Sequence, residues 1–325
     1  MKVTKIIAFG VMASISLNCS SSKEIINSKN EAKTYAEISV KEGGNWNGRK
    51  YEGGTFKNVQ SLSLHPNHTD HSFDIRYEGP GWESNKIGYR LYLDWRNAID
   101  IYGKLTEEMV LSKVGLDGFD SYHNMSDWGA DILKVGKGLG IGSIGRLVNN
   151  EVVHFNEVQN TDVKIENSIQ NSNIQIDYKG WKTNNQTTNL TSNLTIFPNE
   201  RYTQHSIQST TALDGICTGI VNLYGLPMVQ KVSENKKWGY IATYGKQTLF
   251  DDNLGMAIFY RIDNTEKVFQ GKNDYLIQFK PTTSKVTFYF LGAWEKEVNG
   301  IKTEQQFLAY LDTLLNTLNA SNKLD

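Results

Sequence analysis

Apolar residues recur at every second position over most of this chain. In the segment KIGYRLYLD, residues 86–94, every odd-numbered residue is apolar and its neighbours are polar or small. A period of two places alternate side chains on opposite faces of an extended strand, whereas an amphipathic helix needs a period of 3.6. The sequence therefore predicts strands as the main element.

The same alternation returns in segments that are separated by turn clusters. SNIQIDYKG (172–180), LGMAIFYRI (254–262) and SKVTFYFLG (284–292) read as strands, and EGPG (78–81) and KTNNQTTN (182–189) read as turns. Many short strands with only five prolines favour an all-β fold. We expect a large antiparallel β-sandwich, and a mutarotase-like supersandwich is one form that it could take.

One helix is expected, near the C-terminus. Thr303 and Gln306 have the spacing of a capping box, in which each side chain bonds a free backbone N–H of the first turn. The residues after them form one apolar stripe: Phe307, Leu308, Leu311, Leu314, Leu315 and Leu318. We expect this helix to cover an edge or a face of the sheets.

The first 19 residues have the composition of an export signal. Lys2 and Lys5 precede a short apolar run, and Cys19 stands where a bacterial lipoprotein carries its lipid. We expect a signal over 1–19, a flexible tether over 20–35 and one sandwich domain over 36–325. The protein would then be exported and either lipid-anchored to the outer membrane or periplasmic, with ordinary cleavage and secretion as the alternative.

Charge and cofactor motifs exclude several classes of function. The net charge is −1, so no overall field attracts nucleic acid, and an anionic ligand would need a local basic cluster. The glycine-rich run GKGLGIGSIG (136–145) is neither a P-loop nor a dinucleotide fingerprint, and it predicts a bend or a close approach of two backbones. With two cysteines, no zinc-ligand spacing exists, and Cys217 is expected to be a small buried apolar residue.

The histidines differ in their surroundings. His65, His68 and His71 fall in a loop-like run that could hold a metal or form a solvated turn, and His154 reads as a structural histidine. His205 lies in ERYTQHSIQS (200–209), which is polar on both faces, so we expect it to line a cleft together with Arg201.

The segment DSYHNMSDWGADILKVG (120–136) carries the strongest chemical signal. An imidazole such as that of His123 titrates near neutrality, and a neighbouring carboxylate such as Asp127 could orient it. Tyr122 could supply a phenolic proton, Trp128 could stack on a sugar ring, and Lys134 could add positive charge. The alternative is a loop whose polar groups satisfy one another.

A basic partner for this segment is expected from residues 77–103. Arg90 and Tyr92 point away from the apolar face of their strand, and Arg96 follows shortly after. Arginine binds carboxylates through two parallel hydrogen bonds, so Arg90 or Arg96 could hold an acidic sugar, with Trp82 as a stacking wall. The alternative is a structural pair, Arg90–Asp94 or Arg96–Asp100, on a sheet surface.

Long stretches of the chain resemble a known family. YEGPGWESNKIGYRLYLDWRNAIDIYGK (77–104), GFDSYHNMSDWGADILKVGKGLGIGSIG (118–145), DDNLGMAIFY (251–260) and FYFLGAWEKE (288–297) are similar to a family catalogued as a domain of unknown function. The resemblance covers roughly residues 44–318. Members of that family occur in polysaccharide-utilisation systems of marine bacteria.

The resemblance implies an ulvan oligosaccharide dehydratase. Such an enzyme removes water from a saturated glucuronic or iduronic acid that is linked to rhamnose 3-sulfate, and it leaves a 4,5-unsaturated uronate. The partners would be anionic sulfated oligosaccharides, and contact with a membrane would run only through a lipid anchor. No cofactor is predicted, although a divalent metal beside the carboxylate is left open.

The chemistry assigns hypothetical roles to these residues. A base must take the C5 proton, an acid must protonate the departing C4 hydroxyl, and a cation must neutralise the carboxylate. His123 is the predicted base, Tyr122 the acid, and Arg90 with Arg96 the clamp, while His205 with Arg201 is the reserve pair. A polysaccharide lyase and a glycan-binding surface lipoprotein that lacks catalytic activity remain the alternatives.

Overall fold

The alternating segments form strands that pair in three sheets. The computed structural model describes residues 1, 32–117 and 121–325, and within them every ladder between the named strands is antiparallel. Residues 32–325 make one compact unit. The predicted export signal, the lipidation at Cys19 and most of the tether lie outside the described residues.

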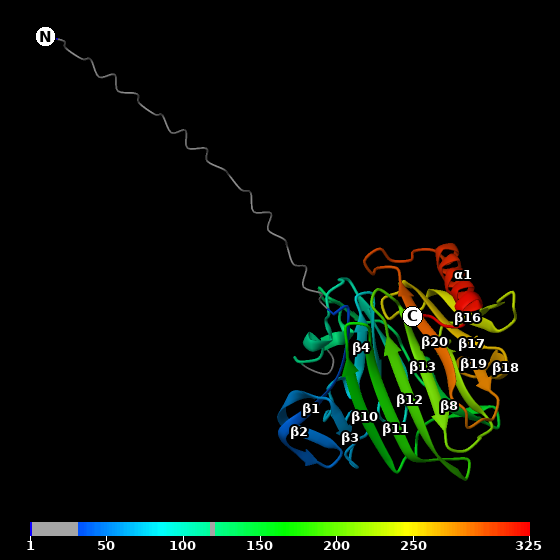
Figure 1. Ribbon diagram of the computed structural model, residues 1–325. Coiled ribbons are helices and arrows are strands. Elements are labelled where there is room, and N and C mark those ends of the chain that lie inside the picture. The colour runs from blue at the N-terminus through cyan, green and yellow to red at the C-terminus, as the bar shows by residue number, and fades with distance from the viewer. Residues whose placement is uncertain (2–31, 118–120) are drawn as a thin grey trace. The chain divides into compact units, whose positions relative to one another are not determined.

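Figure 1 shows how the strands are arranged. The first sheet runs in the order β2-β1-β4-β5-β6-β7, with bounds Lys50–Val59, Thr34–Asn47, Gly81–Ser84, Ile87–Leu91, Ile99–Lys104 and Gly129–Asp131. The second runs β15-β16-β17-β20-β13-β12-β11-β10-β3, with bounds Val229–Val232, Trp238–Lys246, Asn253–Arg261, Val286–Trp294, Tyr202–Ser209, Gln186–Ile196, Ser172–Thr183, Asn160–Asn167 and Ser61–Ser63. The third runs β18-β19-β14-β8-β9, with bounds Thr265–Gln270, Asp274–Phe279, Ile216–Val221, Ile141–Val148 and Glu151–Val153.

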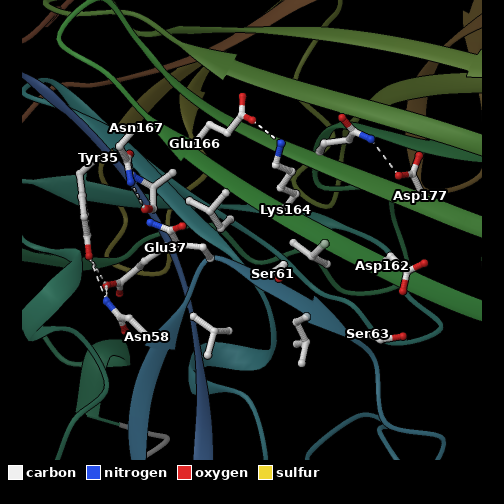
Figure 2. A pocket seen from close by; sticks show the side chains of 17 residues that line it. Tyr35, Glu37, Asn58, Ser61, Ser63, Asp162, Lys164, Glu166, Asn167 and Asp177 are labelled. Carbon is white, nitrogen blue, oxygen red and sulfur yellow. Dashed lines mark hydrogen bonds and ion pairs between the residues drawn. The ribbon is translucent and has the colours of Figure 1, made fainter.

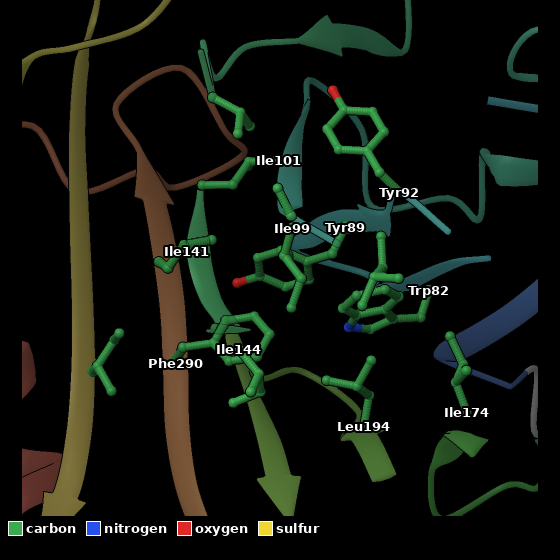
Figure 3. Close-up of a cluster of buried hydrophobic side chains, with 14 of the residues drawn as sticks. Trp82, Tyr89, Tyr92, Ile99, Ile101, Ile141, Ile144, Ile174, Leu194 and Phe290 are labelled. Carbon is green, nitrogen blue, oxygen red and sulfur yellow. The ribbon is translucent and has the colours of Figure 1, made fainter. Parts of the chain in front are cut away.

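The main core lies between the second sheet and the other two. Tyr89 of β5 packs its ring edge-on against Phe290 of β20, and Ile141 of β8 belongs to the same buried cluster. Figure 3 shows these side chains gathered between the strands. Burying them removes a large apolar surface from water, which is the main favourable term in folding. The prediction of a large antiparallel β-sandwich is confirmed.

The C-terminal helix covers the outer face of part of the second sheet. Helix α1 spans Glu304–Ser321, and the side chain of Thr303 accepts a hydrogen bond from the backbone N–H of Gln306, as the capping box predicts. The apolar stripe of α1 packs against β16 and β17 (Figure 1). Strand β20 is therefore buried on both faces, with Phe290 in the main core and Tyr289 under the helix. Among the described residues, no helix is both long and apolar enough to cross a membrane.

The glycine-rich run allows two close backbone approaches. Gly140 has a φ of +72°, and a Cβ atom built on it would lie 1.8 Å from the carbonyl oxygen of Ile99. A Cβ atom on Gly142 would lie 2.2 Å from Cδ1 of Phe290. Neither contact leaves room for a side chain, so the predicted close approach is confirmed. The prediction that Cys217 is buried is also confirmed.

His205 belongs to the core, so the prediction that it lines a cleft is wrong. Its Nε2 lies 2.6 Å from Oγ of Ser192, and its Nδ1 lies 2.9 Å from the carbonyl oxygen of Gly142. Strand β13 is polar on both faces in the sequence. The face that carries His205 is nevertheless buried, because this polar side chain forms hydrogen bonds inside the core. Burial lowers the pKa of His205 to about 4, so the ring is neutral at pH 7.

We expect His205 to make the protein sensitive to acid. Its pKa is lower in the folded state than the value near 6.5 of the unfolded chain, so the unfolded state binds the additional proton. This contribution is fully present above pH 6.5 and is lost as pH falls towards 4, by about 3 kcal/mol in total. The free energy of unfolding of wild type and of His205→Gln, measured across this range, should show a shallower loss in the variant. Equal slopes would contradict this assignment.

Candidate active site

A buried arginine joins three neighbouring strands of the first sheet. Arg90 on β5 lies directly opposite Asp100 on β6, and Asp131 ends β7, the next strand. One guanidinium nitrogen of Arg90, Nη2, donates to Oδ2 of Asp131 at 2.6 Å and to Oδ2 of Asp100 at 3.0 Å. The Arg90 side chain is only 2% exposed, so both carboxylates offset the cost of burying its charge.

Two phenols complete the surroundings of this arginine. Nη2 of Arg90 also donates to the hydroxyl of Tyr92, which in turn donates to Asp100 at 2.6 Å. Nη1 of Arg90 donates to the hydroxyl of Tyr122 at 3.0 Å. Burial of the Asp100 carboxyl and its repulsion by Asp131 raise the pKa of Asp100 to about 7, against the attraction of Arg90. At neutral pH Asp100 is therefore available as a protonated acid.

His123 lies against the same carboxylate pair. The short 3₁₀ turn Ser121–His123 places its Nε2 3.3 Å from Oδ2 of Asp131. The hydrogen bond to Asp131 raises the pKa of the His123 imidazole above its usual value, although partial burial opposes this. The side chain of His123 keeps 35% of its surface exposed, so it can both bind Asp131 and meet a ligand.

These groups line one cavity of about 260 Å³. Its polar lining comprises Arg90, Tyr92, Arg96, Asp100, His123, Asp131 and Lys134, and its other lining residues are Leu133, Val135, Gly136 and Leu249. A cavity that combines a histidine–carboxylate pair with an acid of raised pKa is a candidate catalytic site. Five of the predicted site residues thus line this small cavity: Arg90, Tyr92, Arg96, His123 and Lys134.

The arginines do not have the free guanidinium groups that a carboxylate clamp requires. Arg96 donates through Nη2 to Glu78 at 2.8 Å and to Asp94 at 2.5 Å, and its guanidinium lies 3.9 Å above the Tyr92 ring. The Nη2 group of Arg90 is likewise occupied by Asp100 and Asp131. The alternative of structural ion pairs therefore describes both arginines better, although with exchanged partners. Arg90 pairs with Asp100, and Arg96 pairs with Asp94.

Lys134 is the cation at this cavity whose charge is not already paired. It follows β7 by three residues, its side chain is exposed, and it makes no ion pair with any residue that the structure describes. The sequence identified this lysine only as an auxiliary charge. The geometry makes it the main candidate for contact with an anionic ligand.

The carboxylate beside His123 is Asp131, whereas Asp127 was predicted for that position. Asp127 is exposed on the turn before β7. Trp128 is half-buried with its ring edge-on to Tyr102, and it is not part of the cavity lining. Tyr122 is buried behind Arg90 and does not line the cavity, and burial raises the pKa of its hydroxyl. Burial raises the pKa of the Tyr92 hydroxyl as well, but Tyr92 does line the cavity.

Two further predicted residues lie elsewhere. Trp82 is fully buried, where its Nε1 donates to Oγ1 of Thr203 and its ring stacks on Tyr89, so the prediction that it forms a stacking wall is wrong. Arg201 pairs with Glu297 at 2.5 Å and is absent from the cavity lining. With His205 in the core, the reserve pair is not assembled.

The sequence analysis did not predict Asp100 and Asp131 as residues of the site. Asp100 entered only as a partner for Arg96, and Asp131 was not singled out. Their signal is an acid within a short, mostly apolar strand, because a buried acid needs a partner.

The three loop histidines, His65, His68 and His71, do not form one set of possible metal ligands among the described residues. His65 stacks on Trp46, and His68 bonds Asp74 through Nδ1. Among the described residues, Asp70, His71 and Glu78 bring possible ligand atoms within 4.8 Å of one another. The guanidinium of Arg96 already lies within 3.1 Å of Asp70 and 2.8 Å of Glu78, so this group is neutralised by an arginine.

A larger hollow of about 1000 Å³ lies elsewhere, between β1, β3 and β10. Figure 2 shows that its polar side chains bond one another, for example Asn58 with Glu37 and Lys164 with Glu166. Its lining carries four carboxylates and one lysine, with no histidine. We place the candidate site in the smaller cavity because that cavity contains the His123–Asp131 pair and Asp100.

The family of the chain follows from a sequence match. The model of a domain of unknown function, DUF4861, matches residues 8–323. The chain belongs to the DUF4861 family. Among curated proteins, none matches this DUF4861 chain.

Two solved structures show distant likeness to this DUF4861 protein. A candidate kojibiose phosphorylase from the human microbiome has 13% identity and a TM-score of 0.43, over 74% of this chain and 32% of the other. The chain thus spans about a third of that protein. A candidate aldose 1-epimerase from Klebsiella pneumoniae subsp. pneumoniae MGH 78578 has 8% identity and a TM-score of 0.38, over 89% of this chain and 97% of the other. Likeness at this level carries no argument about activity.

We expect Asp131→Asn to lower the pKa of His123. The negative charge of Asp131 stabilises the imidazolium, so its removal favours the neutral ring and moves the titration to lower pH. The Cε1–H resonance of His123, followed by NMR and assigned with His123→Gln, measures this pKa. A His123 pKa that stays the same or rises in Asp131→Asn would refute the pairing.

Proposed function

We propose that the chain is an oligosaccharide dehydratase. Its substrate would be a saturated glucuronic or iduronic acid at the non-reducing end of an ulvan oligosaccharide, linked to rhamnose 3-sulfate. The product would be a 4,5-unsaturated uronate and water. The observation that carries the proposal is the cavity that brings together the His123–Asp131 pair, Asp100 with its raised pKa, and Lys134, which makes no ion pair with a described residue.

The reaction needs a base on one side of the sugar ring. Neutral His123 takes the C5 proton, and the electron pair of that C–H bond forms the C4=C5 double bond. Asp131 stabilises the imidazolium that results, because its carboxylate lies 3.3 Å from Nε2. Such a positioned base contributes about 100-fold to 10,000-fold in rate.

An acid must assist the departure of the C4 hydroxyl, since hydroxide is a poor leaving group. Tyr92 and Asp100 line the cavity and are joined by a 2.6 Å hydrogen bond. The Tyr92 hydroxyl protonates the leaving oxygen and is reprotonated by Asp100, and the C4–O bond breaks to release water. This pair replaces Tyr122, whose hydroxyl lies behind Arg90.

The carboxylate of the substrate needs positive charge, because it makes the C5 proton less acidic. Two acids, Asp100 and Asp131, line the cavity and pair with Arg90, whereas Arg96 pairs with Asp94 outside the lining. Lys134 is therefore the residue that would bind the uronate carboxylate, and protonation of Asp100 removes one opposing charge.

We expect wild type to lower the mass of a saturated uronate-terminated oligosaccharide by one water and to produce unsaturated-uronate absorbance. His123→Ala should reduce kcat/KM at least 100-fold with little change in thermal unfolding. His65→Ala, in a loop outside the cavity, is the control and should keep wild-type activity. The rate should rise with pH as His123 becomes neutral and fall again as Asp100 loses the proton that the leaving group needs.

The same assay separates the alternatives. Splitting of the chain would identify a polysaccharide lyase, which uses the same proton abstraction but expels a sugar alkoxide. Binding without any change of mass would identify a glycan-binding protein. Activity retained within a few-fold in His123→Ala would reject this residue as the base.

We expect Lys134→Met to raise KM for the uronate substrate about tenfold or more, because a hydrogen bond to a charged group is lost. Lys285→Met is the matched control, since Lys285 is also exposed and makes no ion pair with a described residue. Steady-state kinetics of both variants measure the effect. Equal KM values in the two variants would exclude Lys134 from carboxylate binding.

A further inference from the structure

Two guanidinium groups lie against the ring of Tyr92, the proposed acid. The guanidinium carbon of Arg96 lies 3.9 Å from the centre of this ring, and that of Arg90 lies 4.7 Å from it. Nη2 of Arg90 also donates to the Tyr92 hydroxyl at 2.8 Å, whereas Arg96 meets the face of the ring. The roles proposed above place Arg90 at the centre of the network, but they give Arg96 no part in the reaction.

Three acids hold Arg96 in this position. Its Nε donates to Asp94 at 2.9 Å, and its Nη2 donates to Glu78 at 2.8 Å and lies 3.1 Å from Asp70. Burial lowers the pKa of the Arg96 guanidinium, but the hydrogen bonds to Asp94 and the nearby negative charges raise it more, so the group stays charged. A positive charge is therefore fixed against the Tyr92 ring.

The backbone at Glu78 has an unusual conformation that connects these groups. Glu78 has a φ of +68°, which residues other than glycine rarely adopt. Its Oε1 accepts the hydrogen bond from Arg96, and its Oε2 lies 3.8 Å from Nη1 of Arg90. Its carbonyl oxygen accepts a hydrogen bond from the backbone N–H of Leu93, the residue after Tyr92. Glu78 thus ties both arginines to the segment that carries the acid.

A negative charge forms on Tyr92 when its hydroxyl protonates the leaving group. Burial raises the pKa of Tyr92 well above its usual value, although the charge of Arg90 opposes this, so the phenolate is costly without positive neighbours. A cation over an aromatic ring is attracted by the electrons of that ring, and a phenolate ring holds more negative charge than a phenol ring. The contact with Arg96 is therefore stronger during the reaction than before it, which is what lowers a barrier.

We propose that Arg96 is a positioning residue for the acid step, which stabilises the Tyr92 phenolate through the face of the ring and so speeds the departure of the C4 hydroxyl. This inference rests on the proposed function, because it assumes that Tyr92 protonates the leaving group. The Tyr92 proton passes to the leaving oxygen, water departs with the electron pair of the C4–O bond, and Asp100 returns a proton to Tyr92.

A change of leaving group distinguishes this role from a structural one. The probes are a disaccharide of glucuronate linked to rhamnose 3-sulfate and its 4-deoxy-4-fluoro analogue, in which fluorine replaces the C4 hydroxyl. Fluoride departs with the electron pair of the C4–F bond and needs no proton from Tyr92, whereas both reactions need His123 to take the C5 proton. Unsaturated-uronate absorbance measures both rates, and a fluoride electrode checks the second.

We expect Arg96→Gln to lower kcat for the hydroxyl probe about 30-fold, the effect of a desolvated cation–π contact, and to change kcat for the fluoro probe by less than about threefold. Tyr92→Phe should show the same selective loss, and Arg96→Gln should add little to it, because no phenolate then forms. Arg261→Gln is the matched control and should leave both rates unchanged. Arg261 also pairs with an aspartate, Asp263, and lies 5.7 Å from the Trp238 ring, outside the cavity lining.

The same assay shows whether each variant is folded. An Arg96 variant that releases fluoride at the wild-type rate keeps a working base, and thus a folded site. Arg96→Lys gives the answer if Arg96→Gln does not fold, because an ammonium still neutralises Asp94 and Glu78 but lacks the flat guanidinium that stacks on the ring. We expect Arg96→Lys to lower kcat about tenfold for the hydroxyl probe alone.

The outcomes separate this inference from the proposed function. A loss confined to the hydroxyl probe, with no further loss when Tyr92→Phe is combined with Arg96→Gln, would support the role of Arg96. Equal losses with both probes in a folded variant, or no loss with either, would overturn it while dehydration by wild type stands. If wild type forms an unsaturated product from neither probe, the proposed function fails, and this inference fails with it.

Discussion

The buried guanidinium of Arg90 is the interaction on which the candidate site depends. It binds Asp100 and Asp131 and two phenols, and so connects β5, β6, β7 and the turn that carries His123. Removing one partner of such a buried group leaves an uncompensated charge, which is far more costly than the net gain of the pair. The ion pairs and hydrogen bonds of Arg90 therefore hold the site in this geometry before any ligand binds.

The same network limits the negative charge that the proposed anionic substrate would meet in this cavity. Oδ2 of Asp131 contacts both Arg90 and His123, so the negative charge of Asp131 already interacts with these two side chains. Asp100 carries a proton about half of the time near pH 7 because burial and Asp131 raise its pKa. The second arginine, Arg96, neutralises a separate group of acids. Among the described residues of the cavity lining, Lys134 is then the lysine or arginine that makes no ion pair.

Much of the fold could be predicted from local pattern, because each element carries its own signal. The period of two predicted the strands, and Thr303 with Gln306 predicted the start of α1 at the residue where it begins. The glycine-rich run predicted close backbone contacts, which Gly140 makes with Ile99.

The site was harder to predict, because it depends on which strands are neighbours. The sequence predicted that His123, Arg90 and Lys134 contribute to one site. His123 and Lys134 lie in the segment 120–136, and Arg90 lies in the segment 77–103. The sequence did not predict that Asp100 lies opposite Arg90, since the pairing register of β5 and β6 is a tertiary property. His205 was misassigned for a related reason. A polar strand face is equally compatible with a cleft and with a buried hydrogen-bonded core.

The alternation of β5 also constrains how this protein can evolve. Tyr89 faces the main core and Arg90 faces the carboxylates, so a shift of one residue would place the guanidinium among aromatic rings. An insertion or deletion in this strand would therefore destroy both the packing and the site. Leu223 and Tyr224, by contrast, lie on a segment outside the strands, where changes of length leave the ladders intact. Insertions or deletions in that segment would therefore leave the Arg90 network in place.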